Sequence, residues 1–476
     1  MRALTLIHRW LGVAFALFFA MWFASGIVMH FVPFPALTEA ERIDGLAPLS
    51  GTAIQNGPDA AIRASGLAEA DRVRLFVRSD GAIYVIRSGA SVVALHAENL
   101  SPAGVRTGEL AVAIAADHAR RRGLDVSHAS LEALADYDQW SVPNDLDPHR
   151  PLYRIALGDA AGTELYVSSQ TGEVVRDTTR RERAWNYAGS VVHWIYPTVL
   201  RRNWPLWDAT VWTLSLIALL TAIAGVALGV LRMRWRSLST PYRAWHAWHH
   251  ALGIGCALFV LTWIASGWLS MDHGRIFSTG KPDAHEARAF TGELLVTMLG
   301  ATALSGAETA ARELGWFDFG GRAYRRERID LERQHLRTFP RSALRDEPWL
   351  TDDEVTAAAR RLAGCGSVAV VGGDDAYAMK SATPGAPVYR VQCGETWLHV
   401  DGASGALLER LDPSRRAYRW LYSALHTLDF PALMQRPTLR TAIVVVLCAV
   451  GFVFSMTGVV IGWRRLTKPN PNPPPP

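Results

Sequence analysis

The stretch HRWLGVAFALFFAMWFASG occupies residues 8–26, and the related stretch HHALGIGCALFVLTWIASG occupies residues 249–267. Ten of the nineteen aligned positions are identical. Each stretch belongs to an apolar run of about 20 residues or more, the length that spans a bilayer. The sequence therefore predicts a membrane protein with an internal repeat.

A second repeat, at an offset of 233 residues, joins the end of each outer part to the span that follows it. Its matches are Thr163 with Thr396, Leu165 with Leu398, Val167 with Val400, Gly172 with Gly405, Arg183 with Arg416, His193 with His426, Gly225 with Gly458 and Gly229 with Gly462. The two repeats together describe a duplicated unit of span, outer domain and span. Because both copies have the same orientation, we expect a pseudo-two-fold axis along the membrane normal.

Four apolar runs predict a four-helix transmembrane bundle built from this duplicated unit. The predicted segments are a first span (1–32), an outer domain (33–206), a second span (207–231), a cytoplasmic loop (232–247), a third span (248–271), a second outer domain (272–440), a fourth span (441–463) and a Pro-rich cytoplasmic tail (464–476).

Basic residues indicate the orientation of these spans. They precede the first span, fill the loop between the second and third, and follow the fourth: Arg2, Arg9, Arg232, Arg234, Arg236, Arg243, Arg464, Arg465 and Lys468. Because cytoplasmic loops are enriched in Lys and Arg, we expect a multi-pass protein with both termini in the cytoplasm. The two large outer domains are then expected in the periplasm, outside a bacterial inner membrane.

The outer domains have the pattern of small α+β units. Thr351 and Glu354 form a capping box that predicts a helix to about Leu362. Matching turns at residues 168–172 and 401–405 separate short β-rich runs in both halves. The predicted strands are 152–157, 163–167, 368–371, 388–392, 396–400 and 406–411, with a further hairpin from 74–77 and 83–87 and a helix at 109–122.

Composition excludes several classes of function. The 49 basic and 44 acidic residues give a net charge of +5, and no basic stripe suggests nucleic acid. The four cysteines form no C-x-x-C pair. Cys365 and Cys393 are a disulfide candidate in an oxidising compartment, a pairing that the sequence leaves open. The arginine-rich stretch 322–337 is either a solvated charged helix face or an attractor for an anionic ligand.

The chain resembles the bacterial PepSY-associated transmembrane proteins. The pattern His8-Arg-Trp-Leu-Gly12 that opens a span, its copy at His249 and the V-x-x-x-T/S-G turns carry the resemblance, which covers nearly the whole chain. It implies PepSY-like outer domains. Some members are similar to inner-membrane ferric-siderophore reductases of the ferrioxamine type, whose four-helix membrane part carries b-type haems.

Histidines near the ends of the spans are the candidate cofactor ligands. The repeats make His8 equivalent to His249 and His193 equivalent to His426, so each pair is expected to face across the pseudo-two-fold axis. Two facing imidazoles supply both axial ligands of a haem iron, and two haem b groups follow from two pairs. His30, His273 and His246 are second-rank candidates. The alternative is that these histidines simply lie in the polar interface.

The predicted function is that of a ferric-siderophore reductase, an oxidoreductase that passes electrons across the membrane to a ferric siderophore or another ferric chelate. No flavin or nicotinamide fingerprint is present, so quinol or a separate donor must supply the electrons. Membrane lipid is the other expected partner. The first alternative is a non-enzymatic PepSY module that binds or regulates a peptide or peptidase. The second is permeation of haem or iron.

Overall fold

The structure is a computed structural model that describes residues 1–67, 69–292, 299, 303–339, 343–344, 348–379 and 381–467. The chain divides into two compact units. The helical unit contains residues Met1–Phe34, Ala184–Thr279 and Arg416–Pro476, and the sheet unit contains Pro35–Arg183 and Gly280–Arg415. The predicted Pro-rich tail lies outside the described residues beyond position 467.

Among its described residues, the helical unit contains three helices that are long and apolar enough to cross a membrane: α1 (Arg2–Phe31), α7 (Trp204–Arg232) and α16 (Pro437–Thr467). The third predicted span differs, because it consists of two helices, α8 (Ala244–Gly255) and α9 (Ala257–Leu269), bent by 71° at Cys256. Gly253 and Gly255 immediately precede the bend, and glycine pairs are a frequent cause of helix kinks.

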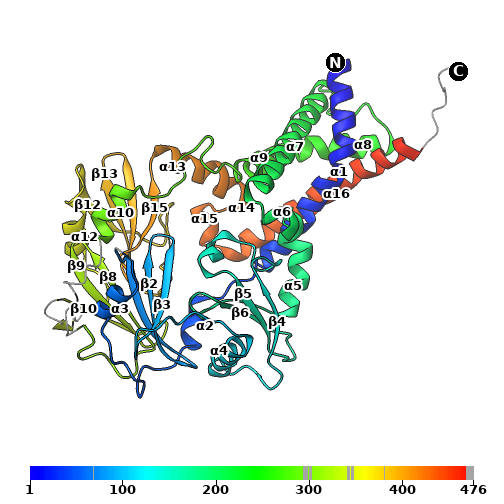
Figure 1. Ribbon diagram of the computed structural model, residues 1–476. Helices are drawn as coiled ribbons and strands as arrows, with labels where there is room; N and C mark the ends of the chain where they lie inside the picture. Colours follow the sequence, from blue (N-terminus) through cyan, green and yellow to red (C-terminus); the bar gives the residue numbers. More distant parts are fainter. Residues whose placement is uncertain are drawn as a thin grey trace. The chain divides into compact units, whose positions relative to one another are not determined.

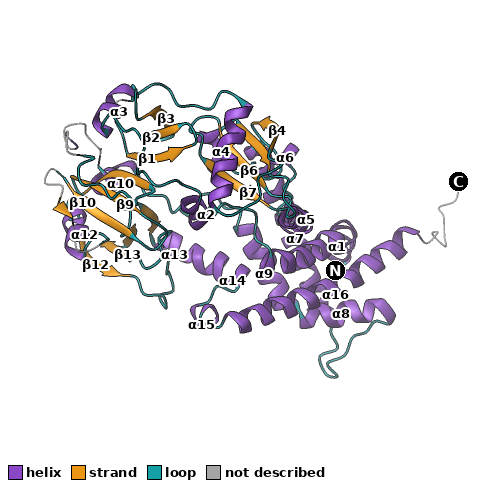
Figure 2. Ribbon diagram, turned by 90° about the horizontal axis from the view of Figure 1, so that it is seen from below, coloured by secondary structure: helices purple, strands orange, loops and turns teal. Residues whose placement is uncertain are grey.

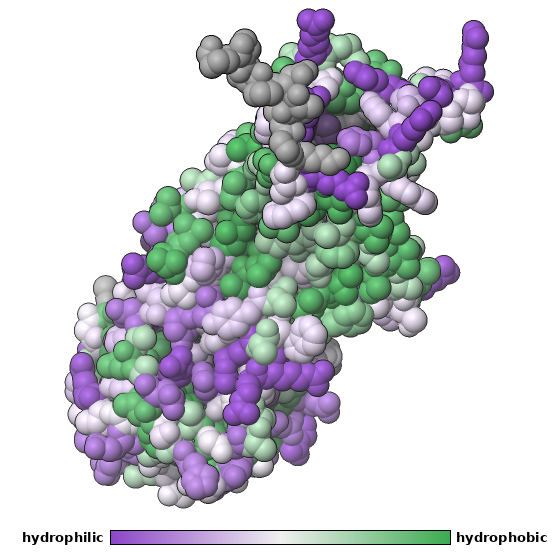
Figure 3. Space-filling model, turned by 90° about the vertical axis from the view of Figure 1, so that its right-hand side faces the viewer, coloured by the Kyte–Doolittle hydropathy of each residue, from purple (hydrophilic) through white to green (hydrophobic). Residues whose placement is uncertain are grey.

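Aromatic and small side chains form the core of the helical unit. Helix α1 packs against α16 and α7, and α7 packs against α9 (Figure 1). Phe19, Phe23 and Trp263 are buried in this core. Figure 3 shows that apolar side chains also gather on the outer surface. Among the exposed apolar residues of the long helices, Leu17 is 68% and Leu258 is 79% exposed. An apolar exterior around an apolar core is the pattern of helices that face lipid.

Short helices precede the second and fourth long helices. Their bounds are α5 (Arg180–Asn186), η2 (Tyr187–Val191) and α6 (Thr198–Arg201) in the first half, and α13 (Pro413–Arg419), η3 (Trp420–Ala424), α14 (Leu425–Thr427) and α15 (Pro431–Met434) in the second. Within the helical unit, η2 packs against α1, and η3 and α14 pack against α9. These segments carry His193 and His426 back onto the long helices.

In the described part of the sheet unit, the strands form one seven-stranded and two four-stranded antiparallel sheets. Figure 2 shows these strands in orange. The seven-stranded sheet has the order β11-β10-β9-β8-β1-β2-β3. Its strands are β1 (Arg72–Arg78), β2 (Gly81–Ser88), β3 (Ser91–His96), β8 (Glu313–Phe319), β9 (Arg322–Arg328), β10 (Gln334–Thr338) and β11 (Ala343–Leu344). The expectation of separate outer domains is therefore wrong for this part, because β1 and β8 pair and join both halves in one sheet.

Each four-stranded sheet is formed within one half. Their orders are β4-β5-β6-β7 and β12-β13-β14-β15. The strands are β4 (Ser130–Ala135), β5 (Leu152–Ala156), β6 (Glu164–Ser168), β7 (Val174–Thr178), β12 (Cys365–Val370), β13 (Val388–Cys393), β14 (Thr396–Asp401) and β15 (Leu407–Leu411). Helix α4 (Gly108–Arg121) packs on the first sheet and α12 (Asp352–Ala359) on the second. The Thr351 capping box is present, and α12 ends three residues before the predicted end.

The other short helices in the described part of the chain are α2 (Glu39–Asp44), α3 (Pro58–Ala64), η1 (Asn144–His149) and α10 (Ala284–Thr291). The prediction of a charged helix at 322–337 is wrong, because this stretch forms β9 and β10. Arg325 and Arg328 on β9 are almost fully buried. A solvated face is thereby excluded for these two side chains, and Arg325 is paired with buried Glu327 at 2.6 Å.

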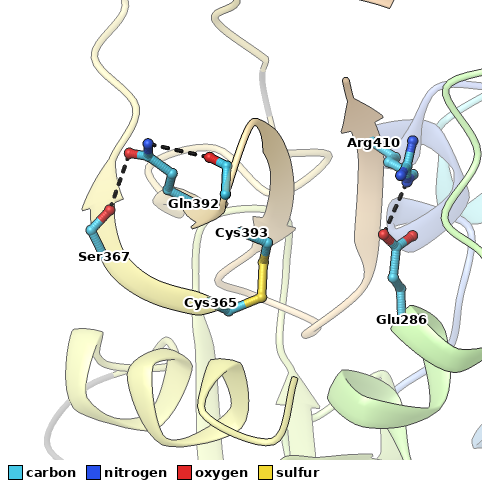
Figure 4. Close-up of a disulfide and its surroundings, with 7 residues drawn as sticks. Glu286, Cys365, Ser367, Gln392, Cys393 and Arg410 are labelled. Carbon is cyan, nitrogen blue, oxygen red and sulfur yellow. Dashed lines mark hydrogen bonds and ion pairs between the residues drawn. A yellow bond between two sulfur atoms is a disulfide. The ribbon is translucent and has the colours of Figure 1, made fainter. Parts of the chain in front are cut away.

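A disulfide joins Cys365 and Cys393 in the second four-stranded sheet (Figure 4). The two residues are direct partners in the ladder between β12 and β13. At the opposite edge of this sheet, Glu286 of α10 and Arg410 of β15 form an ion pair of 2.9 Å (Figure 4). A bridge that closes a loop of 28 residues stabilises a fold by about 3.6 kcal/mol through the entropy of the unfolded chain.

Candidate cofactor site

Two pairs of histidines lie in the helical unit. The ring centres of His8 on α1 and His249 on α8 are 6.3 Å apart, and the two rings are inclined by 35°. The ring centres of His193 and His426 are also 6.3 Å apart, with an inclination of 66°. The structure thus brings together the four first-rank residues in the pairing expected from the repeats.

The Nδ1 atom of every one of these four rings is hydrogen-bonded to an oxygen of the helical unit. His8 Nδ1 donates to the carbonyl of Thr221 at 3.2 Å, and His249 Nδ1 lies 2.9 Å from Thr457 Oγ1. Since the Thr457 hydroxyl donates to the carbonyl of Phe454, it accepts from His249. Both rings therefore carry their proton on Nδ1.

The second pair is anchored in the same way by two serines. His193 Nδ1 donates to Ser25 Oγ at 3.0 Å, and His426 Nδ1 donates to Ser266 Oγ at 3.2 Å. Each serine hydroxyl is itself committed to a carbonyl of its own helix. Ser25 and Ser266 are equivalent positions of the first repeat, but the repeat alone does not predict that they bind the rings.

Because each ring carries its proton on Nδ1, the lone pair of its Nε2 atom is available. Among the residues that the structure describes, none forms a hydrogen bond with Nε2 of His8, His249, His193 or His426. A histidine that binds a metal usually donates its other N–H to a protein oxygen, which fixes the tautomer and the ring direction. All four rings have the tautomer that a metal ligand requires.

The separation within each pair fits one metal ion between two rings. Imidazole nitrogens bind a metal at about 2 Å, so two opposed nitrogens are about 4 Å apart and the ring centres about 6 Å. No group of three or more His, Cys, Asp or Glu side chains in the described part of the chain is arranged to hold a metal ion. Two protein ligands suit an iron whose other ligands come from a porphyrin.

A glycine faces each of the four rings. A Cβ atom at Gly225 would lie 2.6 Å from His8 Cε1, and one at Gly267 would lie 3.1 Å from His426 Cε1. At Gly458 and Gly26 the distances to the Cε1 atoms of His249 and His193 are 3.5 and 3.8 Å. The four glycines are equivalent in pairs between the two halves. A side chain at Gly225 or Gly267 would press on the ring that it faces, whereas at Gly458 and Gly26 a Cβ atom would make only an ordinary van der Waals contact.

The second-rank histidines lie elsewhere, and none of them faces another histidine within the described ranges. His30 Nε2 bonds to Thr441 Oγ1 at 2.8 Å, and His273 Nδ1 bonds to Asp208 Oδ1 at 2.5 Å. His246 is exposed beside Tyr242.

Aromatic side chains occupy the length of α1 between the two pairs. Trp22 donates its indole N–H to the carbonyl of His193 at 3.0 Å. Phe23 contacts Phe259 and Trp263 at ring-centre distances of 6.2 and 6.0 Å. The same Trp263 offers its carbonyl to His426 Nδ1 at 3.3 Å. Both tryptophans therefore connect the aromatic core directly to the second pair.

The PepSY-associated TM region, a family defined by its sequence, matches residues 5–465. The chain belongs to this family. This PepSY-associated protein is accordingly a membrane protein, in agreement with its long apolar helices. A comparison with curated proteins finds no match.

Proposed function

We propose that this PepSY-associated protein is a four-span haem b protein of the bacterial inner membrane, which arose by duplication and which reduces a ferric chelate in the periplasm. The bent pair α8 and α9 is counted as the third span. The observation that carries the proposal is the pairing of four imidazoles, each held at Nδ1 and each with a bare Nε2.

Haem b, when bound, supplies a one-electron carrier at each pair. The chain's own residues fix the positions of the histidine rings. Thr221, Thr457 and the two serines hold the rings, and the facing glycines admit them to the helix surfaces. Electrons from quinol or a separate donor then cross toward the outer pair, and ferric iron in a siderophore is reduced to ferrous iron, which its chelators bind more weakly.

The distance between the pairs matches a path across the membrane. His8 and Ser25, the residue that binds His193, are seventeen positions apart on α1, which is about 26 Å at the helical rise of 1.5 Å per residue. The hydrocarbon core of a bilayer is about 30 Å thick. The aromatic side chains around Trp22 and Trp263 fill the interval.

An absorption spectrum of the detergent-purified protein, oxidised and then reduced, tests the proposal. We expect a sharp reduced band and about two haems per chain, since there are two histidine pairs. His8→Ala and His193→Ala should each remove one low-spin signal and leave the other. His246→Ala is the matched control, because this ring is exposed and unpaired with another histidine.

The variants that lose a haem should also lose reduction of a ferric siderophore, measured by trapping the ferrous product. A featureless spectrum of protein produced with ample haem would overturn the proposal. The non-enzymatic PepSY module, with a peptide or peptidase as partner, would then be the better account.

A further inference from the structure

One face of the seven-stranded sheet carries arginines from strands of both halves. Arg74 on β1 is opposite Gly315 on β8, and Gly315 is opposite Arg326 on β9. Arg72 and Arg328 lie two positions further along their strands. Because alternate residues of a strand point to the same side, these four arginines share one face, which we call the arginine face.

The centre of the arginine face is hollow. Gly315 lies between Arg74 and Arg326 in the ladder, and it contributes no side chain. A Cβ atom built on Gly315 would meet no atom within 4 Å. There is consequently room for a small group directly over this residue, with guanidinium groups on both sides.

Most of the surrounding charges are paired. Arg74 binds Glu173 at 2.6 Å, and Arg42 of α2 binds Glu313 at 2.7 Å. Arg328 pairs with Glu39 through Nη1. Burial alone would raise the pKa of the Glu313 carboxyl, but the adjacent Arg42 and Arg74 hold it well below its usual range. Glu313 is therefore ionised and neutralises only part of the cluster.

Two arginines retain unused donors. In the described ranges Arg326 forms no hydrogen bond and no ion pair, while Nε and Nη2 of Arg328 are buried without a partner. Arg328 is only 1% exposed. A buried donor without an acceptor costs roughly 1–3 kcal/mol, and more when it is charged.

The charge balance also favours an anion. Arg42, Arg72, Arg74, Arg87, Arg326 and Arg328 lie among Glu39, Glu173, Glu313 and Asp401, so six positive charges meet four negative ones. Burial, together with the nearby Arg328 and Arg72, lowers the pKa of Arg326 to about 9. Negative charge placed beside Arg326 would relieve this repulsion.

We propose that the arginine face binds a compact oxyanion with at least two negative charges over Gly315, with Arg326 and Arg328 as the donors. Guanidinium groups bind carboxylates and phosphates through paired N–H donors, which gives both affinity and direction. Arg72 closes the site from β1, where it donates to the carbonyl of Ser404 at 3.2 Å. The site does not depend on haem.

Citrate and inorganic phosphate are suitable probes for the purified full-length protein in detergent. The thermal midpoint is followed as each anion is titrated at constant ionic strength, with chloride as the balancing salt, because screening acts on all surface charges alike. We expect a saturable rise with at least one of the two anions. A preference for citrate identifies a polycarboxylate ligand, and a preference for phosphate identifies a phosphorylated one.

Two variants test whether the anion-dependent rise in the thermal midpoint comes from binding at the arginine face. Arg326→Gln removes the unpaired donor and should weaken binding about ten- to a hundredfold. Gly315→Val fills the hollow and suits a β-strand, so the sheet should stay folded while binding falls by a similar factor. Arg333→Gln is the control, because this arginine is 70% exposed in the turn after β9.

No anion-dependent rise in the unsubstituted protein would overturn the proposal. An equal response of Arg326→Gln and the unsubstituted protein would also overturn it, since the arginines would then serve the fold alone. If Arg326→Gln fails to fold, the test rests on Gly315→Val, and an undiminished response of that variant would overturn the proposal. The haem spectrum plays no part in the measurement, so its result and that of the proposed electron transfer are separable.

Discussion

At the residue scale, the four paired histidines share one chemical state. Each ring has its Nδ1 proton bound by an oxygen of the same unit. The oxygens come from three kinds of group, a backbone carbonyl and the hydroxyls of threonine and serine. The repeats predicted which histidines pair, but they could not predict the two acceptors that come from threonines, because Thr221 and Thr457 are not equivalent positions.

His118 in the sheet unit is a buried histidine of a different kind. It is 5% exposed, and its Nε2 has no partner in the described part of the chain. Burial, together with the charges of Arg122 and Arg42, lowers the pKa of His118 to about 3. The ring is thus neutral in the folded protein at pH values where it is protonated in the unfolded chain.

This difference in His118 protonation between the folded protein and the unfolded chain predicts that the folded protein becomes less stable in acid. Below the ordinary pKa of 6.5 the unfolded chain takes up a proton that the folded protein does not, so stability falls as the pH falls from 6.5 toward 3. Between pH 7.5 and 5 the loss should reach about 2 kcal/mol. The loss is measured by comparing the thermal midpoints of the unsubstituted protein and of His118→Gln at pH 7.5 and at pH 5. An identical pH dependence in the two proteins would contradict the prediction.

At the scale of elements, the sequence predicted the apolar helices and most strands of the four-stranded sheets. It did not predict the bend at Cys256, because an apolar run has the same composition whether it is straight or bent. It also failed for β9, where Arg325 and Glu327 lie on one face and Arg326 and Arg328 on the other. With charges on both faces, the usual alternation of apolar and polar residues is missing.

The glycines that face the rings give a prediction at this scale. Gly225→Val on α7 places a side chain within contact of His8 and should displace its ring from the Thr221 carbonyl. One of two haems should be lost, about half of the reduced absorption, while the signal from His193 and His426 remains. Haem content per chain is the measurement.

Gly12→Val on α1 is the matched control for this substitution, since a Cβ atom there meets nothing within 4 Å. It should retain both haems. Retention of both haems by Gly225→Val as well would show that α7 does not constrain the first pair.

At the scale of the whole molecule, the proposed topology places residue 237 and residue 132 on opposite sides of the membrane. Both Ser237 and Glu132 are exposed, and the native cysteines are either buried or disulfide-bonded. Glu132→Cys should react with an impermeant maleimide in intact spheroplasts. Ser237→Cys should react only in inverted vesicles, because the loop that contains it is rich in arginine. The reverse pattern would exclude the proposed orientation.

The pairing of β1 with β8 has a consequence for the synthesis of the chain. The two strands are about 240 residues apart, an interval of roughly 12 to 50 s at translation rates of about 5–20 residues per second. During this time β1 has a bare edge of N–H and C=O groups, the kind of surface that recruits foreign strands. Until β8 has been synthesised, the nascent first half is therefore open to pairing with strands of other chains. A chain truncated before residue 313 would keep that edge exposed permanently.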